Sequence, residues 1–428
     1  MGDIIARGIA SQKPKSLRIL SKVNLSYCYE LIDTDGTLYI SQYAKLYSST
    51  NYGDTKTLVH DFGTGTLITL SKLLASGTML VQLNDGDGTY SLYRSTDKGA
   101  NWTMVLDPCP FILNQGWCED ASGSIYIMSY NNSPSALWGQ IYRSDNDGAT
   151  WTLIKSITGI KHIHFIAEDP YNPGTLYIGT GDLDAECFWY TSTDKCATLT
   201  QIGTGSQRYR TVSMLFTPNY IVWGMDSTDL AQPPYLMRRN RITSVDEYVQ
   251  RVNAPIYFSH KTAKGELLIG SCPEGEFSGA SSTITRESNM YYSNDEGESW
   301  HILYTAKFGQ SYWNQIFFVG EHNGKIYFTQ HTGAGKWSFV AEIVDAEAVP
   351  VEFVEPYIIA ESGKLVIGGA INHQSTKLYY RATEIAEQVG AGSITLVRAG
   401  DGIIFTSPDG TRYKATMANG GTWAITAV

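Results

Sequence analysis

The stretch LYRSTDKGANWTMV (Leu92–Val105) carries most of the fold prediction, because its polar turn recurs along the chain. The same frame stands in IYRSDNDGATWTLI (Ile141–Ile154) and MYYSNDEGESWHIL (Met290–Leu303). The shared pattern is an apolar residue, Tyr, Ser, Asp or Asn, Gly, Trp and a pair of apolar residues. A motif that repeats in register predicts a repeat architecture, in which each copy belongs to one structural unit.

Two degraded copies follow the same frame. LYSSTNYGDTKTLV (Leu46–Val59) has lost the Trp, and WYTSTDKCATLTQI (Trp189–Ile202) has Cys196 in place of the Gly. The first four anchoring serines of the five copies stand 46, 49 and 48 residues apart, and the last follows after about two periods. The spacing therefore indicates units of nearly constant length.

A second signature, a turn followed by a short apolar run, accompanies these units. The eight runs begin at Gly36, Gly77, Gly123, Gly174, Asn219, Gly265, Gly324 and Gly363. Short strands rich in Tyr, Ile, Val and Thr between Gly turns are typical of four-stranded β-propeller blades. Eight runs predict an all-β propeller of eight blades, with seven as the alternative if one unit lies outside the ring.

The motif S-x-D-x-G-x-x-W resembles the Asp box, or BNR repeat, of sialidases and many other propellers, and this resemblance covers residues 26–385. It implies that each copy forms the turn between the third and fourth strands of a blade. The Asp is expected to accept backbone hydrogen bonds, the Gly to take a positive φ and the Trp to pack between blades. The residues given this structural role are Ser49, Asn51, Gly53, Ser95, Asp97, Gly99, Trp102, Ser144, Asn146, Gly148, Trp151, Ser192, Asp194, Ser293, Asp295, Gly297 and Trp300.

Three parts of the chain are predicted: residues 1–25 with a ring-closing strand, the propeller at 26–387, and a small C-terminal β-hairpin module at 388–428. SLRILSK (Ser16–Lys22) is expected to complete the last blade around KLYYRAT (Lys377–Thr383). The C-terminal module, with its SPDG and NGG turns, resembles modules at the ends of bacteriophage tail proteins. This resemblance implies a phage virion protein made in the host cytoplasm, with a bacterial cytoplasmic or exported protein as the alternative.

The composition argues against several classes of protein. A net charge of −10 offers no basic patch for nucleic acid, and no apolar run approaches the length of a membrane span. The N-terminal residues lack the apolar core of a signal peptide. The six cysteines show no metal-ligand spacing, although Cys109 and Cys118 would be able to bridge in an oxidising compartment. We expect no cofactor and no metal ion.

The candidate functional residues lie in loops on the face of the ring opposite the repeated turn. GTGDLDAEC (Gly179–Cys187), GTGSQRYRT (Gly203–Thr211) and GMDSTD (Gly224–Asp229) hold most of them. The predicted ligand-binding residues are Asp182, Asp184, Glu186, Arg208, Tyr209, Arg210, Asp226 and His331, and the candidate catalytic carboxylates are Asp182, Asp226 and Glu274.

Two histidines stand close together upstream of these loops. His162 and His164 are two apart on a strand, so they face the same side. With His260 or His331 they would form a metal or lyase site, and the alternative is that all four are ordinary packed or surface histidines.

Three functions stay open at this stage. The main hypothesis is a non-catalytic phage protein that binds host cell-surface glycan and other tail or virion proteins, with self-association also open; Trp189, Tyr209 and Trp313 would stack on sugar rings. The second is a glycan-processing enzyme, a glycoside hydrolase with two carboxylates or a lyase. The third is a purely structural virion propeller, in which Asp182, Arg210 and Asp226 tie neighbouring blades together.

Overall fold

The structure is a computed structural model that divides into two compact units, Met1–Asp345 and Ala346–Val428. The residues described are 15–25, 28–130, 138–203, 205–229, 231–273, 287–306, 314–332, 335–346, 357–361, 364–368, 379–381, 402–406, 412–417 and 423–427. The predicted boundary between residues 387 and 388 differs from this division, which falls between residues 345 and 346.

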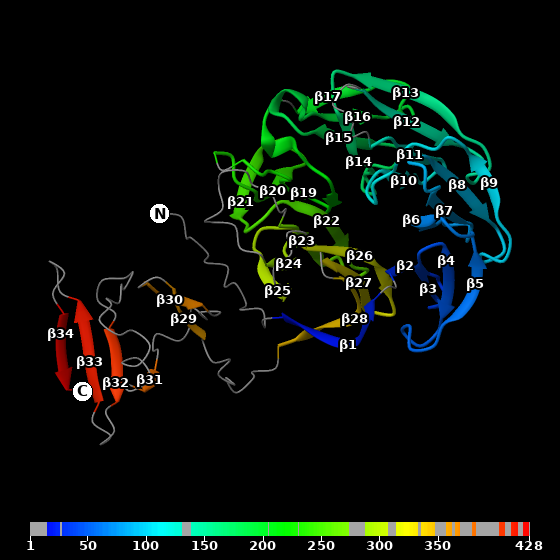
Figure 1. The fold of residues 1–428 in the computed structure, drawn as a ribbon. Coiled ribbons are helices and arrows are strands. Elements are labelled where there is room, and N and C mark those ends of the chain that lie inside the picture. Colours follow the sequence, from blue (N-terminus) through cyan, green and yellow to red (C-terminus); the bar gives the residue numbers. More distant parts are fainter. Residues whose placement is uncertain are drawn as a thin grey trace. The chain divides into compact units, whose positions relative to one another are not determined.

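Seven four-stranded antiparallel sheets form a ring in the described part of the first unit (Figure 1). Blade one holds β2 (Cys28–Ile32), β3 (Leu38–Gln42), β4 (Lys45–Ser49) and β5 (Thr57–Asp61). Blade two holds β6 (Leu67–Leu73), β7 (Met79–Asn84), β8 (Tyr90–Ser95) and β9 (Thr103–Leu106). Blade three holds β10 (Trp117–Glu119), β11 (Ile125–Met128), β12 (Trp138–Ser144) and β13 (Thr152–Thr158).

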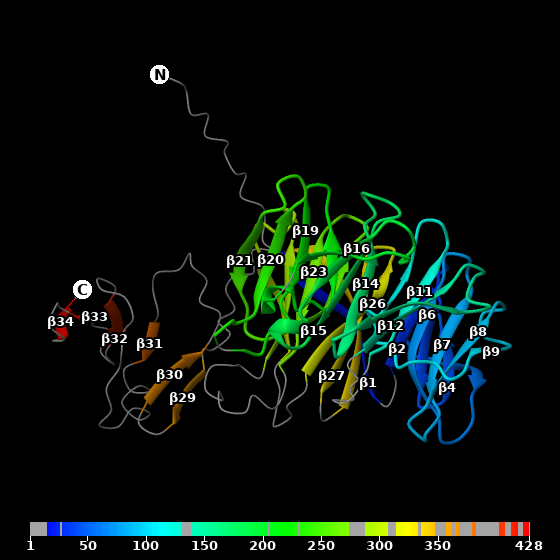
Figure 2. The same cartoon turned by 90° about the horizontal axis from the view of Figure 1, so that it is seen from above.

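Blade four, which carries the candidate site, holds β14 (His162–Glu168), β15 (Leu176–Gly181), β16 (Trp189–Ser192) and β17 (Thr200–Gly203). Blade five holds β18 (Met214–Phe216), β19 (Tyr220–Gly224), β20 (Tyr235–Asn240) and β21 (Asp246–Arg251). Blade six holds β22 (Ile256–Lys261), β23 (Leu267–Ser271), β24 (Ser288–Ser293) and β25 (His301–Ala306). The first strands of the blades lie nearest the ring axis, and Figure 2 shows the ring from its side.

Blade seven closes the ring with strands from both ends of the first unit. It holds β26 (Asn314–His322), β27 (Lys325–Thr332) and β28 (Gly335–Asp345), and the N-terminal β1 (Lys15–Leu25) pairs antiparallel with β28. The predicted closing strand thus exists, but it pairs with β28 and not with residues around KLYYRAT. The long edge of β28 accepts β1 over nearly its whole length, so this blade needs no later strand.

The prediction of eight blades is wrong, and the alternative of seven is observed. Seven of the eight apolar runs form the second strands of blades. The eighth run, after Gly363, forms β30 (Lys364–Gly368), which lies in the second unit and, among the described strands, pairs with β29 (Tyr357–Glu361) alone. A Gly turn and an apolar run therefore identify a hairpin, but they do not reveal whether further strands complete a blade.

The second unit contains a second sheet besides the β29–β30 hairpin. Its strand order is β31 (Tyr379–Arg381), β32 (Gly402–Thr406), β33 (Arg412–Met417) and β34 (Trp423–Ala427). The pairs β32–β33 and β33–β34 are antiparallel, whereas β31 runs parallel to β32.

The repeated motif forms a turn between the third and fourth strands of blades one, two, three, four and six. In blade two, Ser95 Oγ donates to Asp97 Oδ1 over 2.8 Å and accepts from the Gly99 N–H over 2.9 Å. Asp97 Oδ1 also accepts from the Asn101 N–H, and Trp102 Nε1 donates to the Gly99 carbonyl. Within this turn the Ser95, Asp97 and Trp102 side chains therefore find their hydrogen-bond partners locally.

Glycine in the motif allows close packing between blades. Gly99 has a φ of +86°, and a Cβ there would lie 3.0 Å from Val59 of blade one. Trp102 packs beside it against Leu46 and Met79, which come from blades one and two. In blade four Cys196 takes the positive φ instead, at 65°, and its thiol is buried.

The residue before this glycine contacts the preceding blade in four of the turns. Asp147 accepts from Ser76 Oγ over 2.7 Å and from Arg94 Nη2 over 2.6 Å, and both partners belong to blade two. Lys98 lies 2.8 Å from Asp35, and Lys195 donates to Ser124. Glu296 accepts from Thr217 and Asn219 in the same way. The turns thus connect neighbouring blades by hydrogen bonds that the sequence prediction did not include.

All six cysteines are free and buried in the structure, so Cys109 and Cys118 do not bridge. Burial raises the pKa of both thiols to about 12. Within the described ranges the helices are two single 3₁₀ turns, η1 (Asp184–Glu186) and η2 (Gln207–Tyr209), and none has the length and apolar character of a membrane span.

Candidate functional site

Blade four brings its polar residues together at the end of the ring opposite the repeated turns. Strand order alternates direction, so the start of β14 and the end of β15 meet at one end, and the motif turn after β16 lies at the other. His162 opens β14, Asp182 follows the last residue of β15, and Arg210 lies just before β18 of blade five. The prediction that candidate residues converge opposite the motif therefore has a direct topological cause.

A β-bulge in β14 turns His164 toward this end. Ile163 pairs with Thr180 and Phe165 with Gly179, so His164 is the extra residue that has no partner in the ladder. Such bulges re-aim side chains, and they often lie next to functional sites. A Cβ on Gly181 would lie 3.0 Å from the His164 ring, so glycine there admits the imidazole.

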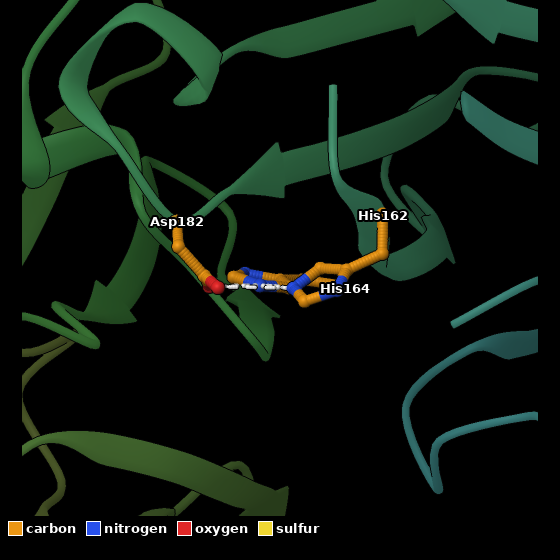
Figure 3. Close-up of side chains that lie close together, drawn as sticks. All are labelled: His162, His164 and Asp182. Carbon is orange, nitrogen blue, oxygen red and sulfur yellow. Dashed lines mark hydrogen bonds and ion pairs between the residues drawn. The ribbon is translucent and has the colours of Figure 1, made fainter. Parts of the chain in front are cut away.

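The two imidazoles and Asp182 form a compact cluster, here named the His–Asp cluster (His162, His164 and Asp182; Figure 3). The Nε2 atoms of the two histidines lie 2.9 Å apart. Each Nε2 lies 3.3 Å from Asp182 Oδ1. Both histidines are fully buried, the Asp182 side chain is 20% exposed, and the Tyr130 ring stacks on His162 at 3.9 Å between centroids.

Two cations complete the surroundings of Asp182. Lys161 Nζ lies 2.6 Å from Oδ2, and Arg210 Nη2 lies 3.2 Å from Oδ1. Arg210 also donates from Nε to Asp226 Oδ2 over 3.0 Å, so its guanidinium connects carboxylates of blades four and five. We name these six residues, Lys161, His162, His164, Asp182, Arg210 and Asp226, the blade-four site.

The charges of the blade-four site follow from burial and from these contacts. Burial alone would raise the pKa of Asp182, but its contacts with the imidazoles of His162 and His164 and the charge of Arg210 outweigh the effect of burial, and the pKa is strongly lowered. Burial lowers the pKa of His164 to about 4, against the opposing effect of Asp182. At neutral pH the site therefore holds an ionised Asp182 and a neutral His164.

Several other predicted ligand-binding residues make hydrogen bonds or ring contacts within this loop region. Asp184 accepts from the side chains of Gln207 and Gln232, and Glu186 accepts from the Asp182 N–H over 3.3 Å. Arg208 lies over the ring of Tyr209 at 4.8 Å. These contacts fix the loops that carry Asp182 and Arg210.

Two of the aromatic residues predicted to stack on sugar rings are buried, so their ring faces are not exposed to a ligand. Trp189 is fully buried, and Tyr209 is 5% exposed, packs edge-on against Trp189 and donates its hydroxyl to Asp246. Their hydrophobic area is used in the core between blades four and five. Trp313 and Glu274 lie outside the described residues.

His260 and His331 belong to other blades, and within the described part of the ring they make their contacts away from the His–Asp cluster. His260 on β22 lies 3.9 Å from Glu321 and stacks on Phe318. His331 on β27 packs against Phe317 and lies 3.9 Å from Cys28 Sγ. Burial lowers its pKa to about 3.

Sequence reasoning missed three charged residues at the inner strands. Lys161 directly precedes His162 in the sequence. This position at the same strand end is the sequence feature from which its place in the site is predictable. Glu30 accepts from Ser41, and burial raises its pKa. Burial lowers the pKa of Lys72 to about 8, against the opposing charge of Glu30. Glu30 and Lys72 are charged residues within otherwise largely apolar first strands of blades. A charged residue in such a strand is the sequence feature that would have pointed to a charged group near the ring axis.

Comparisons with known proteins agree with the fold. No protein-family model matches the chain. A xyloglucanase from Paenibacillus sp is 30% identical over an alignment of 116 residues, and the match covers 25% of this chain and 11% of that protein. The chain thus spans only a small fraction of this curated relative.

Two solved structures share the architecture at low sequence identity. A GH74 xyloglucanase from Xanthomonas campestris is 14% identical with a TM-score of 0.50, covering 76% of this chain and 53% of that one. An oligogalacturonate lyase from Vibrio parahaemolyticus is 9% identical with a TM-score of 0.50, covering 78% of this chain and 98% of that one. At these identities the likeness concerns the β-propeller fold alone.

Proposed function

We propose that the protein is a glycan-processing enzyme of the lyase class, which acts on a uronate-containing polysaccharide at the blade-four site. The observation that carries this proposal is the arrangement around Asp182, which holds two imidazoles and two cations at one end of blade four. The known activities of fold relatives, a xyloglucanase and an oligogalacturonate lyase, support a glycan substrate.

The two described carboxylates do not suit two-carboxylate hydrolysis. A hydrolase needs one carboxylic acid that donates a proton to the leaving oxygen, and therefore a raised pKa. The pKa of Asp182 is lowered instead. Asp226 is 2% exposed and accepts from Arg210, so a sugar cannot reach it without rearrangement.

β-Elimination needs a different set of groups. It removes the proton beside the uronate carboxylate, forms a carbon–carbon double bond and expels the glycosidic oxygen. Lys161 is 33% exposed, the most accessible cation of the site, and it is suited to bind that carboxylate. A neutral imidazole is suited to accept the proton, and burial keeps His164 neutral at neutral pH because it lowers the pKa to about 4. His164 is as buried as Asp226, so this role requires the side chains around it to rearrange when the substrate binds.

The repeated turns support the scaffold part of the proposal. We infer that the motif is an Asp box, because its Ser, Asp, Gly and Trp make the same hydrogen bonds in blades two and six. The motif residues use their polar groups for hydrogen bonds within these turns. We therefore expect the catalytic residues at the opposite end of the ring.

The test is to incubate the full chain with polygalacturonate, alginate and hyaluronan, and with neutral xyloglucan. We expect ultraviolet absorbance from unsaturated uronate ends with one of the acidic polymers. Lys161→Met should lower the rate by about 100-fold or more. Lys155→Met is the matched control, because Lys155 on β13 contacts the Ala197 carbonyl on the side of the motif turn.

The alternative functions give different results in the same assay. New reducing ends without unsaturated product would contradict the lyase and favour a hydrolase. Saturable binding without any product would favour the non-catalytic receptor-binding protein, and a protein that neither binds nor turns over any glycan would favour the structural propeller. The phage-virion origin, its partners and its location stay predictions.

A further inference from the structure

We propose that the His–Asp cluster binds one divalent first-row transition metal ion through His162 Nε2, His164 Nε2 and Asp182 Oδ1. Two imidazoles and one carboxylate are a donor set that suits Mn²⁺, Fe²⁺, Zn²⁺ or Ni²⁺ better than Mg²⁺ or Ca²⁺. The proposal revises the expectation of no metal from the sequence. It goes beyond the proposed lyase activity and does not depend on it, and while an ion occupies His164 Nε2 this imidazole does not also accept the proton.

The spacing of the three donor atoms fits a single ion. Ligand atoms about 2.1 Å from a metal lie roughly 3.0 Å apart at octahedral angles and roughly 3.4 Å apart at tetrahedral angles. The Nε2–Nε2 separation is 2.9 Å and the two Nε2–Oδ1 separations are 3.3 Å. All three edges of this triangle therefore match neighbouring positions around one ion.

Proton placement gives a second, independent reason. If both Nε2 atoms carried hydrogens directed at Asp182 Oδ1, two hydrogens would lie between nitrogens only 2.9 Å apart. At least one Nε2 must therefore present a lone pair to the same point as the carboxylate oxygen. A metal cation placed between the three atoms would accept the lone pairs of both Nε2 atoms and the charge of the carboxylate oxygen. No hydrogens would then have to share the space between the two nitrogens.

The fold holds the donors in place before any ion binds. The β14 bulge sets His164, the Tyr130 ring stacks on His162, and Lys161 holds the second oxygen of Asp182 at 2.6 Å. Only the Asp182 side of the cluster is exposed, so the ion's remaining positions face that side. With Lys161 and Arg210 beside them, those positions would favour an anionic ligand such as a carboxylate.

Two contacts limit the expected affinity. Arg210 Nη2 lies 3.2 Å from the same Oδ1 and competes for it. The buried His164 Nδ1 has no hydrogen-bond acceptor among the described residues, whereas metal-bound imidazoles usually donate from this atom. We therefore expect a dissociation constant in the micromolar range.

The experiment is calorimetric titration of the EDTA-treated full chain, without any substrate, using Mn²⁺, Zn²⁺, Ni²⁺, Mg²⁺ and Ca²⁺. We expect one ion per chain for a transition metal and at least about tenfold weaker binding of Mg²⁺ and Ca²⁺. Pulsed electron paramagnetic resonance of the Mn²⁺ form should show coupling to imidazole nitrogen. This spectrum needs only the unmodified protein, so it decides the matter even where a variant misfolds.

The variants are His162→Gln, His164→Gln and Asp182→Asn, each expected to weaken binding by about tenfold or more. His260→Gln is the matched control, because His260 also lies near a carboxylate, Glu321, but lacks a second imidazole. Its affinity should be unchanged.

The results separate this inference from the proposed function. Absence of binding, binding without nitrogen coupling, or equal losses in the His260→Gln control would overturn the metal site. Metal binding without lyase activity would leave the metal site standing and reject the lyase. Full lyase activity in EDTA-treated protein that binds no ion would support the lyase and reject the metal site.

Discussion

The two ends of the ring use polar residues in opposite ways. At one end the repeated turns hold Ser, Asp and Gly within a few positions of one another, and each turn satisfies its own hydrogen bonds. At the other end the blade-four site joins residues at the start of β14, after β15, before β18 and after β19. The first arrangement recurs in five blades, whereas the second has the His–Asp cluster in one blade of the described ring.

The difference teaches where function is to be sought in a repeat protein. Repetition indicates a role that every blade needs, here the turn and its contact with the preceding blade. Departure from repetition marks residues with a role that is not common to every blade. Four predictions test this contrast, ordered by expected effect.

The largest effect is expected at the blade-four site, from Arg210→Ala. The change leaves Asp182 and Asp226 without their shared cation, and loss of one partner from a buried ion pair costs about 3–5 kcal/mol. Urea denaturation would measure it. Arg210→Lys, which keeps the charge, should recover part of the loss, and equal stability of Ala and wild-type proteins would contradict the argument.

The next effect is expected inside one repeated turn. Ser293 Oγ is buried, accepts from the Gly297 N–H over 3.0 Å and donates to Asp295, so Ser293→Ala should cost about 2 kcal/mol. Ser299 also donates to Asp295 but is exposed, and Ser299→Ala should cost about 0.5 kcal/mol. The melting temperatures of the two variants would measure this difference. Equal losses in melting temperature would contradict the claim that the buried serine contributes more to stability than the exposed one.

A smaller effect is expected at the contact between blades. Asp147→Ala removes the acceptor of Ser76, Thr78 and Arg94 and should destabilise the ring by about 1 kcal/mol. Since Asp147 is partly exposed, added salt should reduce the difference between the variant and the wild type. A variant with unchanged stability at low salt would argue against the role of this contact.

The smallest effect is a pH dependence at Asp97. The Asn101 N–H, the Asn101 side chain and Ser95 lower the pKa of Asp97 to about 2 in the folded protein. Its stabilisation is therefore present above the ordinary Asp pKa and is lost as the pH falls through about 4 to about 2. Asn51 and Asn146 occupy the same position in other turns, so Asp97→Asn should fold well.

Thermal unfolding at several pH values would measure this dependence. At pH 6, where Asp97 is ionised and stabilises the fold, the wild type should melt at a higher temperature than Asp97→Asn. The difference between the two melting temperatures should shrink as the pH falls toward about 2. A constant offset over the whole range would mean that this carboxylate does not contribute to acid sensitivity.

The candidate site was only partly predictable. Asp182, Arg210 and Asp226 were placed at one end of the ring from strand order alone, and the structure brings them together. The same reasoning assigned Trp189 and Tyr209 to a sugar-binding surface, but they are buried between blades. Strand position gives the end of the blade at which a residue lies, whereas burial depends on how the neighbouring blade packs against it.

By itself the sequence determined the β-propeller and the repeated turn, because the hydrogen bonds of that turn join residues at most four positions apart. Only the tertiary structure decided the number of blades, since closure depends on β1 pairing with β28 from the far end of the ring. It also decided that the bulge at His164 and the loop before blade five meet at Asp182. Contacts between distant segments depend on the pairing of whole strands, which local sequence patterns do not specify.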